Sequence, residues 1–256
     1  MQEKDEIECL PELLKGVALF VDVGASLGQY SFFANRILNG GKIFCIEADP
    51  LRMQHLRQFA SKWETMSTNR ITVIHAAAAE KEGKVEFFTT DENVSGGLFV
   101  HGWGATGVKN SVQWTNFEVD CITLDNLFKD LKPDLVKIDV EGAEYRVLEG
   151  ARGILEKGKC RFLVEIHPWG DKCVKKAPSD VFRLFKQFGY DFRRTHRHWL
   201  FEKSDQRFKI FLKCKLICIV MEHAWLKSGL KRSVLTLHAV KRKLLETCIR
   251  PKGSVS

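Results

Sequence analysis

The sequence predicts an α/β fold: a Rossmann-like, doubly wound, mostly parallel sheet with an antiparallel edge. Short apolar runs alternate with segments whose apolar residues recur at helical spacing. Apolar runs of this kind are typical of strands buried on both faces, as in a parallel sheet covered by helices. Near the end of the alternating part, two short strands follow one another, and there we expect the antiparallel edge.

The first ninety residues supply the first alternating units. The run at 18–23 ends in a glycine-containing turn, and Asn39 with Gly40 and Gly41 stops the helix that follows. Pro50 can open the next helix at its first position. We expect strands at 18–23, 42–47, 71–75 and 84–88, and helices over 30–38 and 50–60.

The second half continues the pattern after an interruption. Between 91 and 116 there are five glycines and little periodicity, and a loop of this length is either functional or disordered. Its aromatic residues and His101 are compatible with a lid that covers a substrate. We give this interpretation the same weight as a disordered loop. Beyond it we expect strands at 117–121, 134–140, 161–167, 190–194 and 198–202, and helices over 123–128, 143–151 and 179–188.

Length and charge divide the chain into three parts. With 256 residues and 45% hydrophobic composition, it can form one large domain, expected at 18–203 after a lead-in at 1–17. Residues 200–256 carry 13 Lys and Arg against 4 Asp and Glu, whereas the first 199 carry 27 against 28. The basic extension, 204–256, is therefore the place to look for an anionic partner.

This extension has a helical stripe of apolar residues from Leu226 to Val240, with basic residues elsewhere on the helix. A terminal helix docked on the body with a solvated basic face is favoured over a helix lying on an acidic membrane surface. The acidic start has no secretory signal, and the run at 216–221 is too short to span a bilayer. Eight cysteines without zinc-like spacing indicate free thiols, so we expect a cytoplasmic protein with, at most, peripheral membrane contact.

Acidic residues and glycines follow the first two strands. Asp22 precedes the turn with Gly24 and Gly28, and Glu47 ends the second strand. A carboxylate at that point can accept hydrogen bonds from ribose hydroxyls, although a tight turn and a solvated Glu are the simpler alternatives. The glycine spacing does not match the dinucleotide fingerprint, which disfavours an NAD-dependent dehydrogenase. Asp22 favours a cofactor with an ammonium and a sulfonium over an anionic pyrophosphate.

Five segments extend this pattern: VDVGASLGQYS at 21–31, CIEADP at 45–50, ITLD at 122–125, LVKIDVEGAEYRVLEGA at 135–151 and VEIHP at 164–168. Together they resemble the FkbM-type S-adenosylmethionine-dependent methyltransferases of class I, over about residues 18–203. The segment 135–151 is the most specific part, and Ser26 stands where the family usually has Asn. The resemblance implies the class I methyltransferase fold, S-adenosylmethionine as cofactor, and sugar or polyketide-type alcohols as acceptors.

The resemblance also implies where the cofactor lies. The turn after the first strand would hold the methionine part, Glu47 the ribose, and the segment 75–78 would border the adenine. The residues expected to bind the cofactor are Asp22, Gly24, Ala25, Ser26, Gly28, Tyr30, Ser31, Glu47 and Ala48.

Three residues at the ends of adjacent central strands are candidates for catalysis: Asp139, Glu165 and His167. Methyl transfer to an alcohol requires removal of the hydroxyl proton, and the ordinary pKa of His167 suits a general base. Asp139 could orient this base or the acceptor, and Glu165 is a rival base. The alternatives are a strand-end His167, a buried Lys137–Glu165 ion pair, and a helix-dipole role for Glu141 and Glu144, which we favour for Glu144.

Asp139, Glu165 and His167 could also ligate a divalent metal, which is less favoured than metal-free catalysis. We therefore predict an O-methyltransferase acting on a hydroxyl of a sugar, glycolipid or polyketide-like small molecule. The alternatives are a nucleic-acid methyltransferase that uses the basic extension, which lacks interleaved aromatic platforms, and a non-catalytic scaffold.

Overall fold

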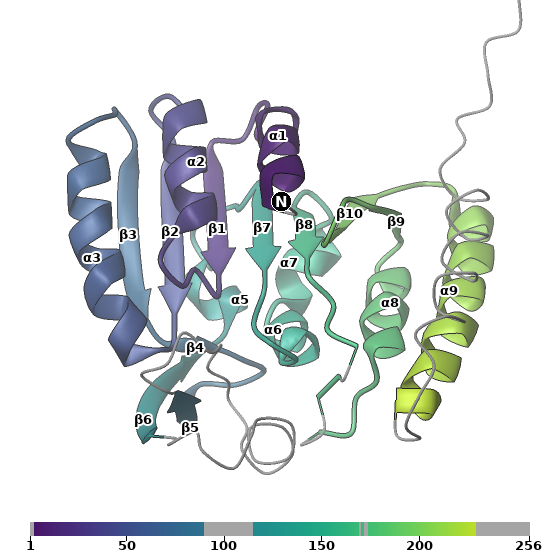
Figure 1. Ribbon diagram of the computed structural model, residues 1–256. Helices are drawn as coiled ribbons and strands as arrows, with labels where there is room; N and C mark the ends of the chain where they lie inside the picture. The colour runs from purple at the N-terminus through teal and green to yellow at the C-terminus, as the bar shows by residue number, and fades with distance from the viewer. Residues whose placement is uncertain (1–2, 90–114, 169, 172–173, 229–256) are drawn as a thin grey trace, which may run out of the picture.

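The computed structural model describes residues 3–89, 115–168, 170–171 and 174–228 (Figure 1). Its main sheet has seven strands in the order β3-β2-β1-β7-β8-β10-β9. The first five of these pair in parallel, and β10 is antiparallel to both β8 and β9. The predicted fold, including its antiparallel edge, is confirmed. The strands are β1 Leu19–Val23, β2 Lys42–Glu47, β3 Arg70–His75, β7 Leu135–Ile138, β8 Arg161–Val164, β9 Tyr190–Arg194 and β10 Trp199–Lys203.

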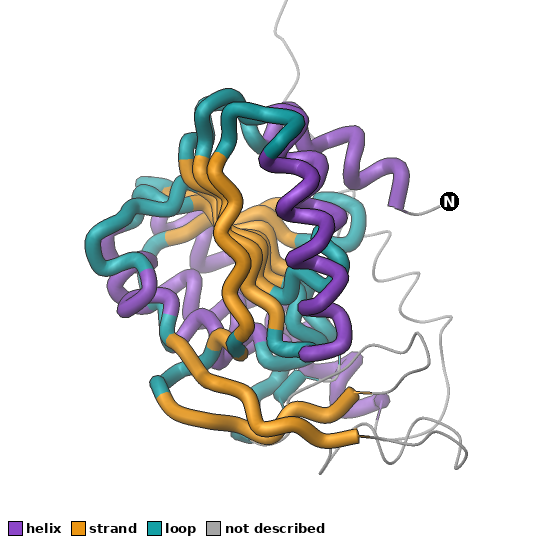
Figure 2. Tube along the Cα trace, turned by 90° about the vertical axis from the view of Figure 1, so that its left-hand side faces the viewer, coloured by secondary structure: helices purple, strands orange, loops and turns teal. Residues whose placement is uncertain are grey.

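Helices cover both faces of this sheet (Figure 2). On one side lie α1 Glu3–Leu13, α2 Gln29–Ile37 and α3 Pro50–Glu64; on the other lie α5 Leu124–Leu127, α6 Glu144–Glu149, α7 Arg152–Lys157 and α8 Pro178–Gln187. Alternation along β1 divides its residues between two cores, because successive strand side chains point to opposite faces. Phe20 shares one core with Leu56 and Leu163, whereas Val21 shares the other core with Leu148 and Phe162.

A second, three-stranded sheet lies below the carboxyl ends of the main strands (Figure 1). It contains β4 Ala77–Ala78, β5 Gly83–Thr89 and β6 Thr115–Ile122, in the order β4-β6-β5. The alternating segment expected at 84–88 is thus an additional strand and not an edge of the main sheet. Residues 91–114 of the predicted lid lie outside the described residues.

The helix expected over 143–151 is interrupted at Gly150 and Ala151 and continues as α7. The carboxylate of Asp125 accepts hydrogen bonds from the backbone of Gly153 (2.7 Å) and Ile154 (2.9 Å). It therefore satisfies backbone donors that α7 leaves unpaired at its start. A side chain from a distant segment allows the second helix to begin there, which local periodicity does not reveal.

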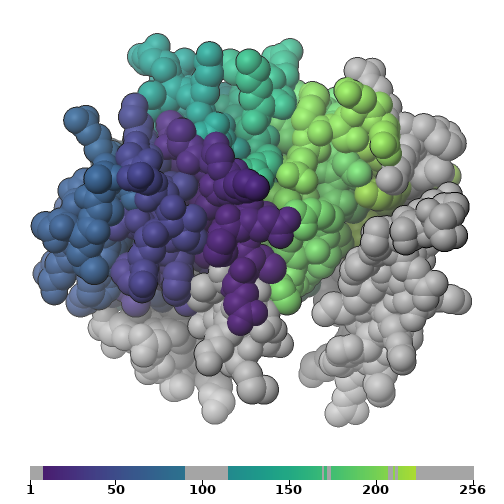
Figure 3. Space-filling view, turned by 90° about the horizontal axis from the view of Figure 1, so that it is seen from above, coloured from purple at the N-terminus to yellow at the C-terminus, as the bar shows by residue number. Residues whose placement is uncertain are grey.

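The lead-in and the extension both pack on the domain. In α1, Leu10 is 1% exposed and Leu13 is 3% exposed, and both share a core with Leu200. Figure 3 shows this N-terminal segment beside the residues near 200. Helix α9, Arg207–Ser228, lies against α8 and buries Cys214 and Cys218.

No helix among the described residues is long and apolar enough to cross a membrane. Of the predicted apolar stripe, all positions beyond Leu226 lie outside the described residues. The contact of this extension with an acidic membrane surface stays a prediction.

Candidate functional site

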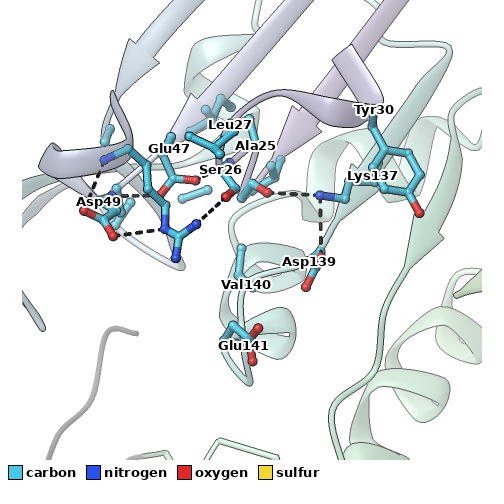
Figure 4. A pocket seen from close by; sticks show the side chains of 18 of the residues that line it. Ala25, Ser26, Leu27, Tyr30, Glu47, Asp49, Lys137, Asp139, Val140 and Glu141 are labelled. Atoms are coloured by element: carbon cyan, nitrogen blue, oxygen red, sulfur yellow. Dashed lines mark hydrogen bonds and ion pairs between the residues drawn. The ribbon is translucent and has the colours of Figure 1, made fainter. Parts of the chain in front are cut away.

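A cavity of about 470 Å³ opens at the carboxyl ends of β1, β2 and β7. Figure 4 shows its wall. Of the residues predicted to bind the cofactor or to take part in catalysis, those that line it are Gly24, Ala25, Ser26, Tyr30, Glu47, Ala48 and Asp139. Those that lie behind or beside the wall are Asp22, Gly28, Ser31, Glu165 and His167.

The turn after β1 contains two glycines, Gly24 and Gly28, that have different structural roles. Gly24 has φ +71°, and a Cβ added to it would lie 1.9 Å from the carbonyl oxygen of Asp139. A glycine lets two backbones approach this closely. Gly28 has φ +82°, and a Cβ there would meet the ring of Trp63 at 2.5 Å. Gly24 therefore shapes the cavity, while Gly28 allows α2 to pack on α3.

Glu47 is almost completely buried at the end of β2 and is held by two backbone donors. Its Oε2 accepts from the Ser26 amide (2.6 Å), and its Oε1 accepts from the Asp49 amide (2.7 Å). Burial raises the pKa of Glu47 by disfavouring the charged form, and these two hydrogen bonds partly offset the effect. The carboxylate is thus fixed in place on the cavity wall.

Asp49 and Arg52 also line the cavity, and the sequence analysis did not single them out. Asp49 caps α3 by accepting from the Leu51 amide (2.9 Å), and it accepts from the Thr89 hydroxyl (2.7 Å). Arg52 donates to the Ser26 hydroxyl (2.8 Å) and lies 3.2 Å from Asp49. The available signal was the Asp-Pro pair at 49–50, which is typical of a helix start.

Asp22 stands behind the wall rather than on it. It is fully buried, accepts from the Ser31 hydroxyl (2.7 Å), and lies 3.0 Å from Lys137 Nζ across the β1–β7 pairing. Direct contact with a cofactor, which the sequence predicts for Asp22 and Ser31, therefore does not fit this geometry. Asp22 instead pairs with Lys137, which does line the cavity.

Lys137 joins both sides of the site. Its Nζ donates to the carbonyl of Gly24 (3.0 Å), lies 3.8 Å from Asp139, and stands over the ring of Tyr30 at 5.0 Å. Burial alone would lower the pKa of Lys137, but the carboxylates of Asp22 and Asp139 outweigh it and raise this pKa. The amine is thus a cation, and it pairs with these residues instead of with Glu165.

His167 lies among three carboxylates from the β7–α6 segment. Its Nδ1 is 2.7 Å from Glu144 Oε1, and its Nε2 is 3.3 Å from Glu141 Oε2 and 3.9 Å from Asp139 Oδ1. Burial alone would lower the pKa of His167, but Glu144, Glu141 and Asp139 raise it to about 9. The imidazole is therefore protonated near neutral pH and donates to the buried Glu144.

This geometry bears on two of the predicted roles. A protonated His167 cannot accept a proton, so the general base expected at that residue needs the neutral imidazole and stays a prediction; Asp139 lines the cavity and is 28% exposed. Glu144, which we expected to act on the helix dipole, is buried and binds His167 directly. A salt bridge between residues 23 positions apart has no local sequence signal.

Glu165 is engaged on the other side of the site. Its Oε1 accepts from Arg197 Nη2 (3.0 Å) and Nε (3.2 Å). Arg197 comes from the turn between β9 and β10 and lines the cavity, whereas Glu165 does not. Glu165 is thus a partner of Arg197, and its role as a rival base stays a prediction.

The described residues contain two groups whose ligand atoms lie within 4.8 Å of one another: Asp139 with Glu165 and His198, and Asp139 with Glu141 and His167. The predicted set of Asp139, Glu165 and His167 is therefore divided between them. In the second group, the same atoms already pair an imidazolium with carboxylates. A divalent metal stays a less favoured prediction.

The sheet order and the cavity at the carboxyl ends of its parallel strands define a class I methyltransferase fold. Residues 22–192, which are 171 of the 256, match the family model described as the methyltransferase FkbM domain. The chain belongs to this family. No curated protein matches the sequence.

Solved structures resemble the fold at low sequence identity. A methyltransferase FkbM from Methylobacillus flagellatus KT is 19% identical with a TM-score of 0.49, covering 72% of this chain and 43% of that one. This chain thus spans less than half of that protein. A precorrin-6y C5,15-methyltransferase from Geobacter metallireducens GS-15 is 13% identical with a TM-score of 0.43, covering 77% and 87%. Aeropyrum pernix fibrillarin, solved with bound S-adenosyl-L-methionine, is 13% identical with a TM-score of 0.42, covering 77% and 75%.

Proposed function

We propose that the protein binds S-adenosylmethionine in this cavity and transfers its methyl group to a hydroxyl oxygen of a sugar, glycolipid or polyketide-like molecule. The observation that carries the proposal is that two carboxylates, those of Glu47 and Asp139, lie on the wall of one cavity. Glu47 is fixed at the end of β2, and Asp139 follows β7 on the other side of the turn 25–27 (Figure 4). The carboxylate of Glu47 suits the cofactor, and the carboxylate of Asp139 suits the acceptor.

The residues present fit the cofactor. Glu47 can accept hydrogen bonds from the ribose hydroxyls. The buried Ala76, Ala77 and Ala78 offer an apolar surface to the adenine. The methionine part would lie against the turn from Gly24 to Leu27, where no bulky side chain intervenes at Gly24. When bound, S-adenosylmethionine supplies an activated methyl group on a sulfonium.

Asp139 is the residue we assign to the acceptor hydroxyl. Its carboxylate can accept the hydroxyl proton and orient the oxygen, because it is partly exposed in the cavity. Lys137 and protonated His167 lie 3.8 and 3.9 Å from it and hold it in place.

Two measurements test this function. Calorimetry with S-adenosylhomocysteine measures cofactor binding, and transfer of a labelled methyl group to a panel of sugars, glycolipids and aliphatic alcohols measures the reaction. Asp139→Asn should keep cofactor binding but lose at least about a hundredfold in transfer rate. Glu118→Gln, on an exposed face of β6, is the matched control. Cofactor binding without transfer to any hydroxyl would overturn the O-methyl assignment, and absence of binding would favour a scaffold.

A further inference from the structure

Glu141 has a backbone conformation that its residue type does not favour. Among the described residues, three non-glycine residues have positive φ: Ser26 at 51°, Glu141 at 54° and Lys175 at 52°. For L-residues this left-handed conformation is strained and persists where the surroundings hold it. Ser26 and Glu141 both line the cavity, whereas Lys175 is exposed elsewhere. The strain at Glu141 therefore coincides with the candidate site.

The bend at Glu141 determines where its side chain lies. The next residue, Gly142, donates its amide to Glu144 (2.9 Å), which fixes the turn between β7 and α6. The carboxylate of Glu141 reaches within 3.3 Å of His167 Nε2, and its side chain remains 34% exposed. Figure 4 shows Glu141 and Asp139 on the same loop of the cavity wall. The turn thus places a second carboxylate next to Asp139.

The two carboxylates are held as a pair. Oxygens of Asp139 and Glu141 lie within 4.8 Å of each other, and His167 Nε2 faces both. A cation between two carboxylates offsets their mutual repulsion. Ionised carboxylates accept hydrogen bonds and cannot donate them. The wall therefore matches a ligand with two closely spaced donors.

We propose that Glu141 binds the acceptor together with Asp139, and that the acceptor is a polyol with hydroxyl groups on neighbouring carbons. This inference rests on the proposed function and names its substrate class. One hydroxyl donates to Asp139, and the oxygen of this hydroxyl receives the methyl group. The neighbouring hydroxyl donates to Glu141, and this second hydrogen bond keeps the reacting oxygen in position. An acceptor with a single hydroxyl lacks the hydrogen bond to Glu141 and is held less firmly.

Saturation-transfer NMR on the protein loaded with S-adenosylhomocysteine tests the binding directly. The probes are myo-inositol and the methyl glycosides of glucose and galactose, each compared with a monodeoxy analogue. Wild type should bind the polyols, and binding should weaken at least about tenfold in Glu141→Gln, in Glu141→Gly and with the deoxy analogues. Lys175→Gly is the control for relief of the same backbone strain away from the cavity, and it should bind like wild type. Equal binding by Glu141→Gly and wild type, or equal binding of deoxy analogues, overturns the proposal.

A second readout separates a binding role from a purely structural one. NMR titration of the His167 ring should show a lower pKa in Glu141→Gln, because a negative charge 3.3 Å from Nε2 is removed. Lys175→Gly should leave that pKa unchanged. A lowered pKa with unaltered polyol binding means that Glu141 only supports His167, and the proposal fails. Absence of S-adenosylhomocysteine binding by the wild-type protein would instead overturn the proposed function itself.

Discussion

Gly24 and Asp139 meet backbone to backbone: a Cβ on Gly24 would lie 1.9 Å from the carbonyl oxygen of Asp139. The amide of Asp139 also donates to the carbonyl of Val23 (3.1 Å), so the segments after β1 and β7 are fixed to each other. One segment forms the turn proposed to hold the cofactor, and the other carries the carboxylate proposed to hold the acceptor. Their separation is therefore set by the absence of a side chain at Gly24.

We predict that Gly24→Ala lowers the free energy of unfolding by about 2 kcal/mol more than Gly40→Ala. Gly40 has nearly the same φ, +70°, but nothing lies within 4 Å of its added Cβ. The control thus carries the backbone strain without the clash. Urea unfolding measures the difference, and calorimetry should show weaker S-adenosylhomocysteine binding for Gly24→Ala alone. Equal losses of stability in the two variants would contradict the close contact.

The buried ion pair of Asp22 and Lys137 supports a second prediction. Lys137→Met leaves the carboxylate of Asp22 buried beside an apolar side chain, and we expect a loss of about 3–5 kcal/mol. Adding Asp22→Asn removes that charge and should recover part of the loss. A double-mutant cycle by urea unfolding measures the coupling. If the two single losses simply add, the residues do not interact as described.

Much of the fold could be predicted from local patterns. Apolar runs and helical spacing locate the main strands and the helices between them, because each element buries its own face. The break between α6 and α7 could not be predicted this way. It depends on Asp125, whose carboxylate reaches the backbone of Gly153 from 28 residues away. Long-range capping of this kind leaves no periodic signal.

The candidate site was predictable where a residue acts from the end of its own strand. Glu47 and Asp139 lie on the cavity wall as expected, since the carboxyl ends of parallel strands meet there. The position of Asp22 relative to the cavity was predicted less well. Its environment depends on Lys137 in the paired strand, and the local sequence does not show which strands pair. The protonation of His167 likewise depends on Glu144, which comes from a different segment.

Cofactor affinity should depend on the charge of Glu47. We predict that Glu47→Gln weakens S-adenosylhomocysteine binding by about tenfold or more, because an amide replaces a carboxylate that accepts from Ser26 and Asp49. Burial raises the pKa of Glu47, so wild-type affinity should fall as the pH drops, beginning above the range in which an exposed Glu protonates. Calorimetry across the acidic range measures both effects. Glu118→Gln is the control, and a pH-independent affinity in wild type would count against a charged Glu47.

The stability of the protein should fall between pH 6.5 and about 9 because of His167. Three carboxylates raise the pKa of this buried imidazole from its ordinary 6.5 to about 9, and the raised pKa means that folding stabilises the protonated form. The resulting stabilisation is fully present below pH 6.5 and is lost as the pH rises through about 9, for a total of about 3 kcal/mol. Urea unfolding at pH 6, 7.5 and 9.5 measures the decline, and His167→Gln removes the titrating group and serves as the control. The wild-type curve should drop more steeply than that of His167→Gln over this interval; parallel curves would mean that the imidazole is neutral in the folded protein, and the role of general base would return to His167.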